Sequence, residues 1–275
     1  MTQVAVITGA ASGIGRALAL ALAARPGAVL QLLDRDAGAL DDTKARCEAA
    51  GARVQAARTD VSDAEAVRGQ AREAAALGDV GMVMAMAGTI HGGAVLASDL
   101  GDMNRVIAVN LTGALNTAAA YLPLLAAGQA GGRLVLCSSG FGVIAAPGYA
   151  AYCASKFGVR GLAAALRSEM RAETRGGAGK VTVTCAIPGM VRTPIMRNGT
   201  YASGQARLRA IEGHERIALT SAERAATVIL RAAERGKPEV TVGVDGAAAR
   251  MASRLPGVPA LLARAVTGGR RGRPR

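Results

Sequence analysis

Tyr152 and Lys156 stand four residues apart in a stretch, 152–173, that predicts a helix. Residues at this spacing share one helical face, so a phenol and an ammonium lie side by side. A free phenol has a pKa of about 10 and is a poor proton shuttle near neutrality. A cation about 4 Å away would lower that pKa by roughly three units before burial opposes the effect. The pair is a candidate general acid and base for an alcohol or a carbonyl.

Ser138 and Ser139 follow the predicted strand 133–137, at the end of the sheet where doubly wound folds bind ligands. A hydroxyl there could hold a substrate oxygen beside the phenol, or it could only cap the strand end. A Tyr-x-x-x-Lys pair alone is common and usually lies on a surface. Its position after the two serines is what favours a catalytic role.

A glycine-rich turn, Gly9 to Gly15, lies between a β-branched run at 4–8 and a helical stretch that ends at Ala24. Glycines let the backbone turn tightly and approach a phosphate, and the following helix offers free N–H groups and a positive dipole end. The alternative is a plain tight turn. The position between a strand and a helix favours a dinucleotide-binding turn.

Asp34 ends the second predicted strand, about 20 residues after the glycines. Its carboxylate can accept hydrogen bonds from both ribose hydroxyls of an adenosine and would repel a 2′-phosphate, which favours NAD over NADP. Arg35 could instead stack on adenine or pair with that phosphate, so NADP stays open. Ser12, where a basic residue would help to bind the phosphate, is neutral. Asp34 could also be only a helix cap.

Strand and helix signals alternate along the chain, and Ser62 with Glu65 fits a capping box at the start of a further helix. Because each helix must carry the chain back across the sheet, this alternation predicts parallel strands. We therefore expect an α/β fold, a Rossmann-type doubly wound parallel sheet of seven strands with helices on both faces. Strands are expected at 4–8, 29–33, 53–58, 80–84, 133–137, 180–186 and 239–244, and helices at 15–24, 36–50, 102–126, 152–173 and 222–235.

The chain has 275 residues and a net charge of +13, with 51% hydrophobic and 2% aromatic residues. This composition supports a large core of aliphatic and small side chains, and it excludes low-complexity disorder, collagen and coiled coil over most of the chain.

The four cysteines are far apart, which favours reduced thiols over disulfides or a metal site. No apolar run approaches the roughly 18 residues of a membrane span, and the N-terminus does not resemble a signal peptide. A cytoplasmic protein is expected.

One catalytic domain is expected over 1–246, followed by a C-terminal extension, 247–275, with a basic and disordered tail. Tail residues 268–275 could bind phosphates or anionic lipid head groups, so a peripheral membrane contact is an alternative to a solvated terminus. Four Tyr and two Phe offer little material for stacking bases, and no specific nucleic-acid partner is expected.

Six signals occur in the order and spacing of the short-chain dehydrogenase/reductase family, and the chain resembles its compact single-domain branch over about residues 3–245. They are Thr8-Gly-x-x-x-Gly-x-Gly15, Asp60-Val61, Val109-Asn-Leu-Thr-Gly113, Ser139, Tyr152-x-x-x-Lys156 and Pro188-Gly189 with Thr193. Agreement among six separate signals makes the resemblance specific. It implies an NAD(P)-dependent oxidoreductase that interconverts a secondary alcohol and a ketone by hydride transfer.

The resemblance also implies a role for each matched residue. Tyr152 would be the proton donor and acceptor, and Lys156 would lower its pKa and bind the nicotinamide ribose. Ser139, rather than Ser138, would position the reacting oxygen, and Asn110 would hold a water that links Lys156 to solvent. The cofactor, NAD with NADP as the alternative, would lie against Gly9, Ser12, Gly13, Ile14, Gly15, Asp34, Arg35, Asp60, Val61, Ala87, Gly88, Tyr152, Lys156, Pro188, Gly189, Val191 and Thr193.

One departure concerns the turn after the fourth strand, where the family usually has Asn-Asn-Ala-Gly and this chain has Ala85-Met86-Ala87-Gly88. The missing amides would normally brace that turn and a neighbouring strand, so cofactor affinity or stability could suffer. The Ala-Gly pair that lets the ribose approach is retained.

Three segments should select the substrate: 89–96, 140–149 and the lid, which we define as residues 194–217. The second has no charged residue and predicts a hydrophobic, steroid-like, retinoid-like or fatty substrate. Four arginines in or beside the lid leave an acidic or acyl-thioester substrate open. His91 and His214 are interpreted as surface residues rather than metal ligands.

Apolar second faces on the helices 102–126 and 152–173 predict a homodimer or homotetramer. A different class of function is a non-catalytic, dinucleotide-sensing protein whose basic tail engages nucleic acid or membrane. An intact Ser139, Tyr152, Lys156 and Asn110 set is hard to explain under that alternative.

Overall fold

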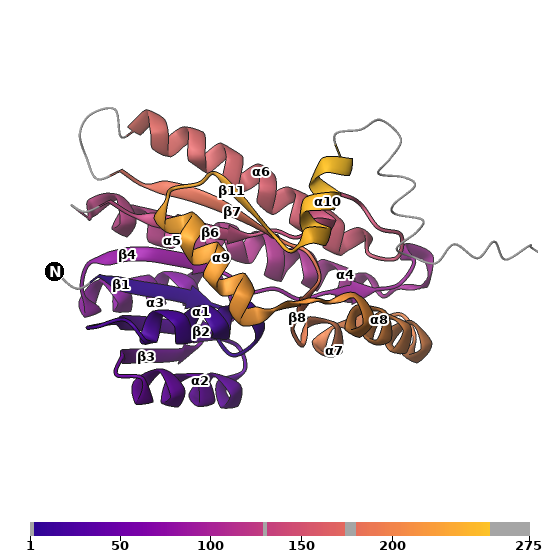
Figure 1. Ribbon diagram of the computed structural model, residues 1–275, viewed down its shortest axis with the longest axis horizontal. Helices are drawn as coiled ribbons and strands as arrows, with labels where there is room; N and C mark the ends of the chain where they lie inside the picture. Colours follow the sequence, from indigo (N-terminus) through magenta and orange to yellow (C-terminus); the bar gives the residue numbers. More distant parts are fainter. Residues whose placement is uncertain (1–2, 129–130, 174–179, 254–275) are drawn as a thin grey trace, which may run out of the picture.

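The computed structural model describes residues 3–128, 131–173 and 180–253. Its centre is a seven-stranded sheet in the order β11-β7-β6-β4-β1-β2-β3, and each neighbouring pair is parallel (Figure 1). The predicted doubly wound parallel sheet is confirmed. The strands are β1 (Val4–Thr8), β2 (Val29–Asp34), β3 (Arg53–Arg58), β4 (Val80–Ala85), β6 (Arg133–Cys137), β7 (Thr182–Pro188) and β11 (Glu239–Val242).

Helices cover both faces of this sheet, and each face has its own hydrophobic cluster. β1 and β4 are buried at every residue, which explains why their sequences are nearly continuous apolar runs. One face packs against α1 (Gly13–Ala23), α2 (Ala37–Ala49) and α9 (Ala222–Glu234), and the other against α3 (Ala64–Leu77), α5 (Gly113–Ala127) and α6 (Ala150–Glu173).

α4 (Leu100–Ile107) continues through a π-helical turn, Ala108–Thr112, into α5. The combined helix of 28 residues has a mean hydropathy of 1.2 in its most apolar window, enough to cross a membrane by length and composition alone. The expectation that no apolar run approaches the length of a membrane span is therefore wrong for this stretch. Its buried side chains, among them Tyr121 and Leu125, instead belong to the core cluster beside the sheet. A core helix passes the same test, and this helix packs as one.

Several predicted boundaries are wrong by one or two residues, among them the end of β11, which is Val242 rather than 244. β7 begins at Thr182 rather than at 180, because Thr182 is the residue that pairs with Arg133 at the start of β6. The cap of α3 is Asp63, whose carboxylate accepts hydrogen bonds from Glu65 and Ala66 N–H at 2.9 and 3.1 Å. The predicted cap, Ser62, donates its hydroxyl to Asp60 instead.

Shorter elements complete the end of the molecule beyond the sheet, where Figure 1 shows α7 and α8 together. The lid consists mainly of the helices α7 and α8. The range of α10 includes the expected domain boundary at 246, and tail residues 268–275 lie outside the described residues. The elements are β5 (His91–Gly92), β8 (Val191–Arg192), α7 (Ile195–Asn198), β9 (Thr200–Tyr201), α8 (Gly204–Ile217), β10 (Thr220–Ser221) and α10 (Val244–Ala252).

Candidate functional site

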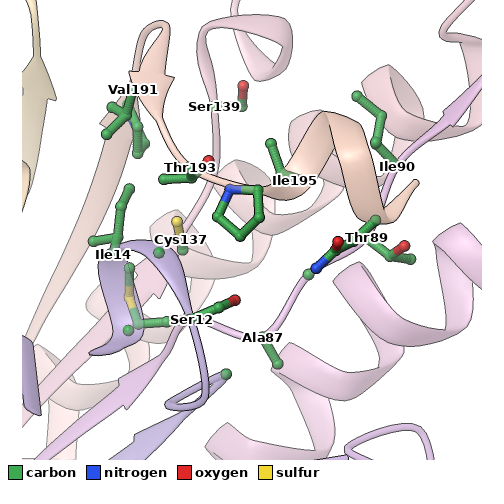
Figure 2. Close-up of a pocket in the computed structure, with 18 of the residues that line it drawn as sticks. Ser12, Ile14, Ala87, Thr89, Ile90, Cys137, Ser139, Val191, Thr193 and Ile195 are labelled. Carbon is green, nitrogen blue, oxygen red and sulfur yellow. The ribbon is translucent and has the colours of Figure 1, made fainter. Parts of the chain in front are cut away.

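A cavity of about 1090 Å³ lies at the carboxyl ends of the sheet strands. Small-molecule sites commonly measure about 300–1,000 Å³, so this one has room for a cofactor together with a substrate. Figure 2 shows Ser12 and Ile14, Val191 and Thr193 around it, with Ile90 among the residues at one end. Every residue predicted to bind cofactor lines the cavity, as do three of the four predicted catalytic residues: Ser139, Tyr152 and Lys156.

The glycine turn, Gly9 to Gly15, packs against the turn that follows β4. Gly9 has a φ of +69°, and a Cβ there would lie 2.7 Å from the backbone of Ala87. A Cβ on Gly15 would lie 2.1 Å from the Gly9 carbonyl oxygen. Because neither position has room for a side chain, the backbone can approach a ligand only with glycine there.

The turn after β4 is braced by Thr8, in the absence of the amides that the family usually has there. The Thr8 hydroxyl oxygen accepts hydrogen bonds from Met86 N–H at 3.1 Å and from Ala87 N–H at 3.2 Å. A Cβ on Gly88 would lie 3.3 Å from Asn110 Oδ1 and 3.4 Å from Lys156 Nζ. The Ala85-Met86 departure therefore leaves an ordered turn whose glycine adjoins Lys156.

Asp34 is held at the edge of the cavity by two backbone groups. Its carboxylate accepts hydrogen bonds from Ala11 N–H at 3.0 Å and from Asp36 N–H at 3.1 Å. A second cavity of about 460 Å³ adjoins it and is lined in part by Arg35 and Arg58. Asp36, Asp60 and Arg105 complete the lining of that second cavity, so the carboxylate of Asp34 borders a cavity that holds both arginines and aspartates.

Tyr152 and Lys156 project from α6 and are buried, at 6% and 3% exposure. Lys156 Nζ donates a hydrogen bond to the Cys137 carbonyl at 2.9 Å and lies 5.7 Å from the centre of the Tyr152 ring. The expected juxtaposition of phenol and ammonium is present, and the lysine is anchored to the end of β6.

The electrostatics of this pair differ from the sequence expectation. Burial raises the pKa of Tyr152, and a hydrogen bond with Ser139 opposes that rise. Burial also lowers the pKa of Lys156. Among the protein's own groups, desolvation therefore outweighs the attraction that we expected to acidify the phenol.

The two serines after β6 have different surroundings. Ser138 donates its hydroxyl to the Lys156 carbonyl at 2.8 Å and is 2% exposed. Ser139 accepts a hydrogen bond from Phe141 N–H at 3.2 Å and also contacts the Tyr152 phenol. Ser138 thus fixes the backbone of α6, whereas Ser139 is the serine beside the phenol.

Asn110 does not line the cavity; it is buried inside the π-helical turn between α4 and α5. Its amide donates hydrogen bonds to the Thr89 carbonyl and to Ser155 Oγ, both at 3.0 Å, and its oxygen accepts one from Thr89 N–H at 2.8 Å. The extra residue in such a turn re-aims side chains and is frequent at functional sites. Asn110 therefore fixes the backbone of the loop after β4 at Thr89.

The far end of the cavity is apolar, and all three predicted substrate segments contribute to it. Its side chains include Ile90, Phe141, Ile144, Met196 and Ile217. Phe141 meets the Tyr152 ring edge-on at 6.1 Å between centroids. The lid-region arginines, at 192, 197, 207 and 209, are exposed and do not line the cavity.

The interpretation of the two histidines as surface residues is wrong. His91 is 3% and His214 is 7% exposed, because each lies between packed loops and hydrogen-bonds to groups there. His214 lines the cavity, as do Asp245 and Ala248 of α10, which sequence analysis also missed. Nothing in the sequence marks these positions, since α10 belongs to a segment with no recognised motif.

A family model described as short chain dehydrogenase matches residues 3–202. SadH of Mycobacterium tuberculosis, whose assignment as an oxidoreductase is itself provisional, is 41% identical over 93% of this chain and 91% of its own length. The 1-deoxy-11-beta-hydroxypentalenate dehydrogenase of Streptomyces arenae is 37% identical over 74% of this chain and 72% of its own.

A solved structure gives the same assignment. A short-chain dehydrogenase/reductase from Burkholderia phymatum in complex with NAD aligns with a TM-score of 0.82 and 28% identity, covering 100% of this chain and 98% of that one. Fold, glycine turn, Tyr-Lys pair and relatives agree: the chain is an oxidoreductase of the short-chain dehydrogenase family.

Proposed function

We propose that the protein is an NAD-dependent oxidoreductase that interconverts a hydrophobic secondary alcohol and its ketone. The observation that carries this is the Tyr152 phenol, buried between Ser139 and Lys156 at the junction of a glycine-lined groove and an apolar pocket. The Streptomyces relative, named as a dehydrogenase of a hydroxylated carboxylate, supports the reaction class and does not bear on the choice of a hydrophobic over an acidic substrate.

Each polar group has a distinct task in this reaction. Tyr152 gives a proton to the carbonyl oxygen during reduction and takes it from the hydroxyl during oxidation. Ser139 holds the same oxygen beside the phenol, and Lys156 stabilises the phenolate while its Cys137 contact fixes its position. The glycine turn, with Asp34 and Thr193, holds the dinucleotide, which supplies the hydride acceptor or donor.

The apolar end of the cavity supports a hydrophobic substrate over an acidic one. Ile90, Phe141 and Met196 offer dispersion contacts and no charge, while the arginines near the lid lie on its exposed surface. An anionic substrate would lose its hydration in this pocket without a compensating partner.

A panel of hydrophobic secondary alcohols and ketones tests the activity, with the absorbance of reduced nicotinamide followed for NAD and NADP in parallel. We expect turnover of at least one apolar pair with NAD and weaker turnover of short acidic analogues. No turnover of any member, with either cofactor bound, contradicts the proposal.

An Asp34→Asn variant is expected to narrow the preference for NAD over NADP about tenfold. The substitution removes the charge that would repel a 2′-phosphate, while the neighbouring Arg35 and Arg58 stay in place. Losing one charge-assisted hydrogen bond also weakens NAD binding by roughly tenfold. The ratio of kcat/KM for the two cofactors measures this, and Asp63→Asn, at the cap of α3, is the control. A wild-type preference for NADP would instead show that Arg35 dominates.

We also infer that two or four copies assemble through the outer faces of α5 and α6. Leu115 on α5 and Phe157 on α6 are 47% and 43% exposed, which leaves apolar area for a partner to cover. Sedimentation at micromolar concentration is expected to show a dimer or tetramer, and a monomer alone rejects the inference.

A further inference from the structure

Three loops from different parts of the chain join over the substrate end of the cavity. Gly93 N–H donates to the Gly148 carbonyl at 2.8 Å, and Thr200 N–H donates to the Ile90 carbonyl at 3.0 Å. The second bond belongs to the short parallel ladder of β5 and β9, which ties the lid to the loop after β4. The lid thus has a defined closed position.

His91 links these loops through its side chain. Its Nδ1 lies 2.8 Å from Thr200 Oγ1 on the lid, and its Nε2 lies 2.9 Å from Ser98 Oγ. The Ser98 hydroxyl donates its own proton to the Ala94 carbonyl at 2.8 Å, so it can only accept from His91. The proton therefore belongs on Nε2, and Thr200 donates to Nδ1. The Asp102 carboxylate is 3.7 Å from Nδ1, beyond hydrogen-bond distance.

His214 makes a comparable hydrogen bond near the C-terminal end of the lid. It lies in the last turn of α8, and its Nε2 donates a hydrogen bond to the Val191 carbonyl at 2.9 Å. Val191 lines the cavity and pairs with Thr220 in the short ladder of β8 and β10. Burial lowers the pKa of His214, which keeps the ring neutral near pH 7.

Most of the lid makes little contact with the core. Its buried apolar anchor is Met196, which packs in a small cluster with Ile90 and Tyr152. Three other lid residues, Ile195, Ala210 and Ile211, are partly buried against that cluster, while long stretches of α8 are exposed. With so little area buried, directed hydrogen bonds decide where the lid rests. Each of these bonds contributes roughly 0.5–1.5 kcal/mol net.

We propose that His91 and His214, the two histidines of this chain, are positioning residues that hold the two ends of the lid over the substrate pocket. By fixing the lid they hold Met196 against Tyr152 and so shape the wall beside the reacting oxygen; this role in turnover rests on the proposed function. Neither histidine touches the reacting atoms. They act through Thr200 and Val191 respectively.

The matched pair Thr200→Val and Thr200→Ser tests the His91 link. Valine keeps the branched shape and removes the donor, whereas serine retains the hydroxyl. Thr184→Val is the control, because Thr184 Oγ1 also makes a buried hydrogen bond, to the Lys237 carbonyl at 2.7 Å, away from the lid. Ser98→Ala removes the hydrogen-bond partner on the other side of the His91 ring. It replaces Thr200→Val as the test if a Thr200 variant does not fold.

The first readout is amide hydrogen exchange, which does not require a known substrate. We expect Thr200→Val to speed exchange at residues 90–93 and 198–202 about two- to tenfold, with the central strands unchanged and Thr200→Ser close to wild type. Equal exchange in Thr200→Val and Thr184→Val overturns the proposal. If the wild type turns over no alcohol or ketone, that result rejects the proposed function. The positioning role of the histidines is then decided by the hydrogen-exchange measurement alone.

The second readout is the division of the effect between KM and kcat. A loosened lid is expected to raise the KM for an accepted ketone about three- to tenfold, with kcat changed less than twofold and NADH affinity unchanged. His214→Leu should raise the KM to a similar extent. His214→Gln retains an N–H donor and should have a KM close to that of the wild type. A fall in kcat with an unchanged KM in both histidine variants overturns the positioning role.

Discussion

Replacing Tyr152 by Phe is expected to lower turnover by about three orders of magnitude while the affinity for NADH changes less than threefold. The substitution removes only the hydroxyl, and a positioned acid or base contributes roughly 10²–10⁴-fold to such reactions. The ring stays packed against Phe141, so the shape of the pocket is retained. Steady-state rates and fluorescence titration of NADH measure the two quantities.

Tyr121→Phe is the matched control for this loss of a buried phenol. Tyr121 donates its hydroxyl to Gln31 at 2.7 Å in the core, away from the cavity. This variant should melt at a lower temperature and keep its kcat. If Tyr152→Phe retained more than a tenth of wild-type turnover, another group would have to move the proton.

Replacing Gly15 by Ala is expected to weaken NADH binding by at least 100-fold or to prevent folding. The new Cβ would lie 2.1 Å from the Gly9 carbonyl, a backbone atom that can move only if the whole turn shifts. Such a shift also displaces Gly9 from its contact with Ala87. Fluorescence titration and a thermal melt separate lost binding from lost stability.

Gly38→Ala is the control for Gly15→Ala, since Gly38 also lies in the first turn of a helix. A Cβ on Gly38 would have Asp36 Oδ1 as its nearest neighbour, at 3.9 Å. Helix propensity favours alanine by about 1 kcal/mol, so this variant should melt slightly higher and bind NADH normally. Normal NADH binding by Gly15→Ala would show that the turn does not hold the cofactor.

The sheet could be predicted because its signals are local. β1 and β4 are apolar runs of fixed length, and the alternation of strands with helices allows little other than parallel pairing. The glycines and the Tyr152–Lys156 pair could be predicted for the same reason, since each motif depends on the spacing of a few residues that are close together in the sequence.

The features that could not be predicted from the sequence depend on contacts between segments that are far apart in the chain. His91 and His214 are buried because the lid folds back onto loops about 110 and 20 residues away, a contact that no local pattern encodes. The raised pKa of Tyr152 has a similar origin, because the degree of desolvation depends on how tightly distant segments close around the phenol. The cap at Asp63 was missed because Ser62 and Asp63 are both good caps, and only the bond from Ser62 to Asp60 decides between them.

The strand order has a consequence for how the chain assembles on the ribosome. From β4 onward each new strand joins beside the one made before it, in the sequence β6, β7 and β11. Synthesis therefore extends the sheet outward from a first half, β1 to β4, that can pair by itself. Until about residue 137 has emerged, the outer edge of β4 has no neighbour and exposes an apolar strand. We expect nascent chains halted in that interval to be the species that chaperones capture and that aggregates most readily.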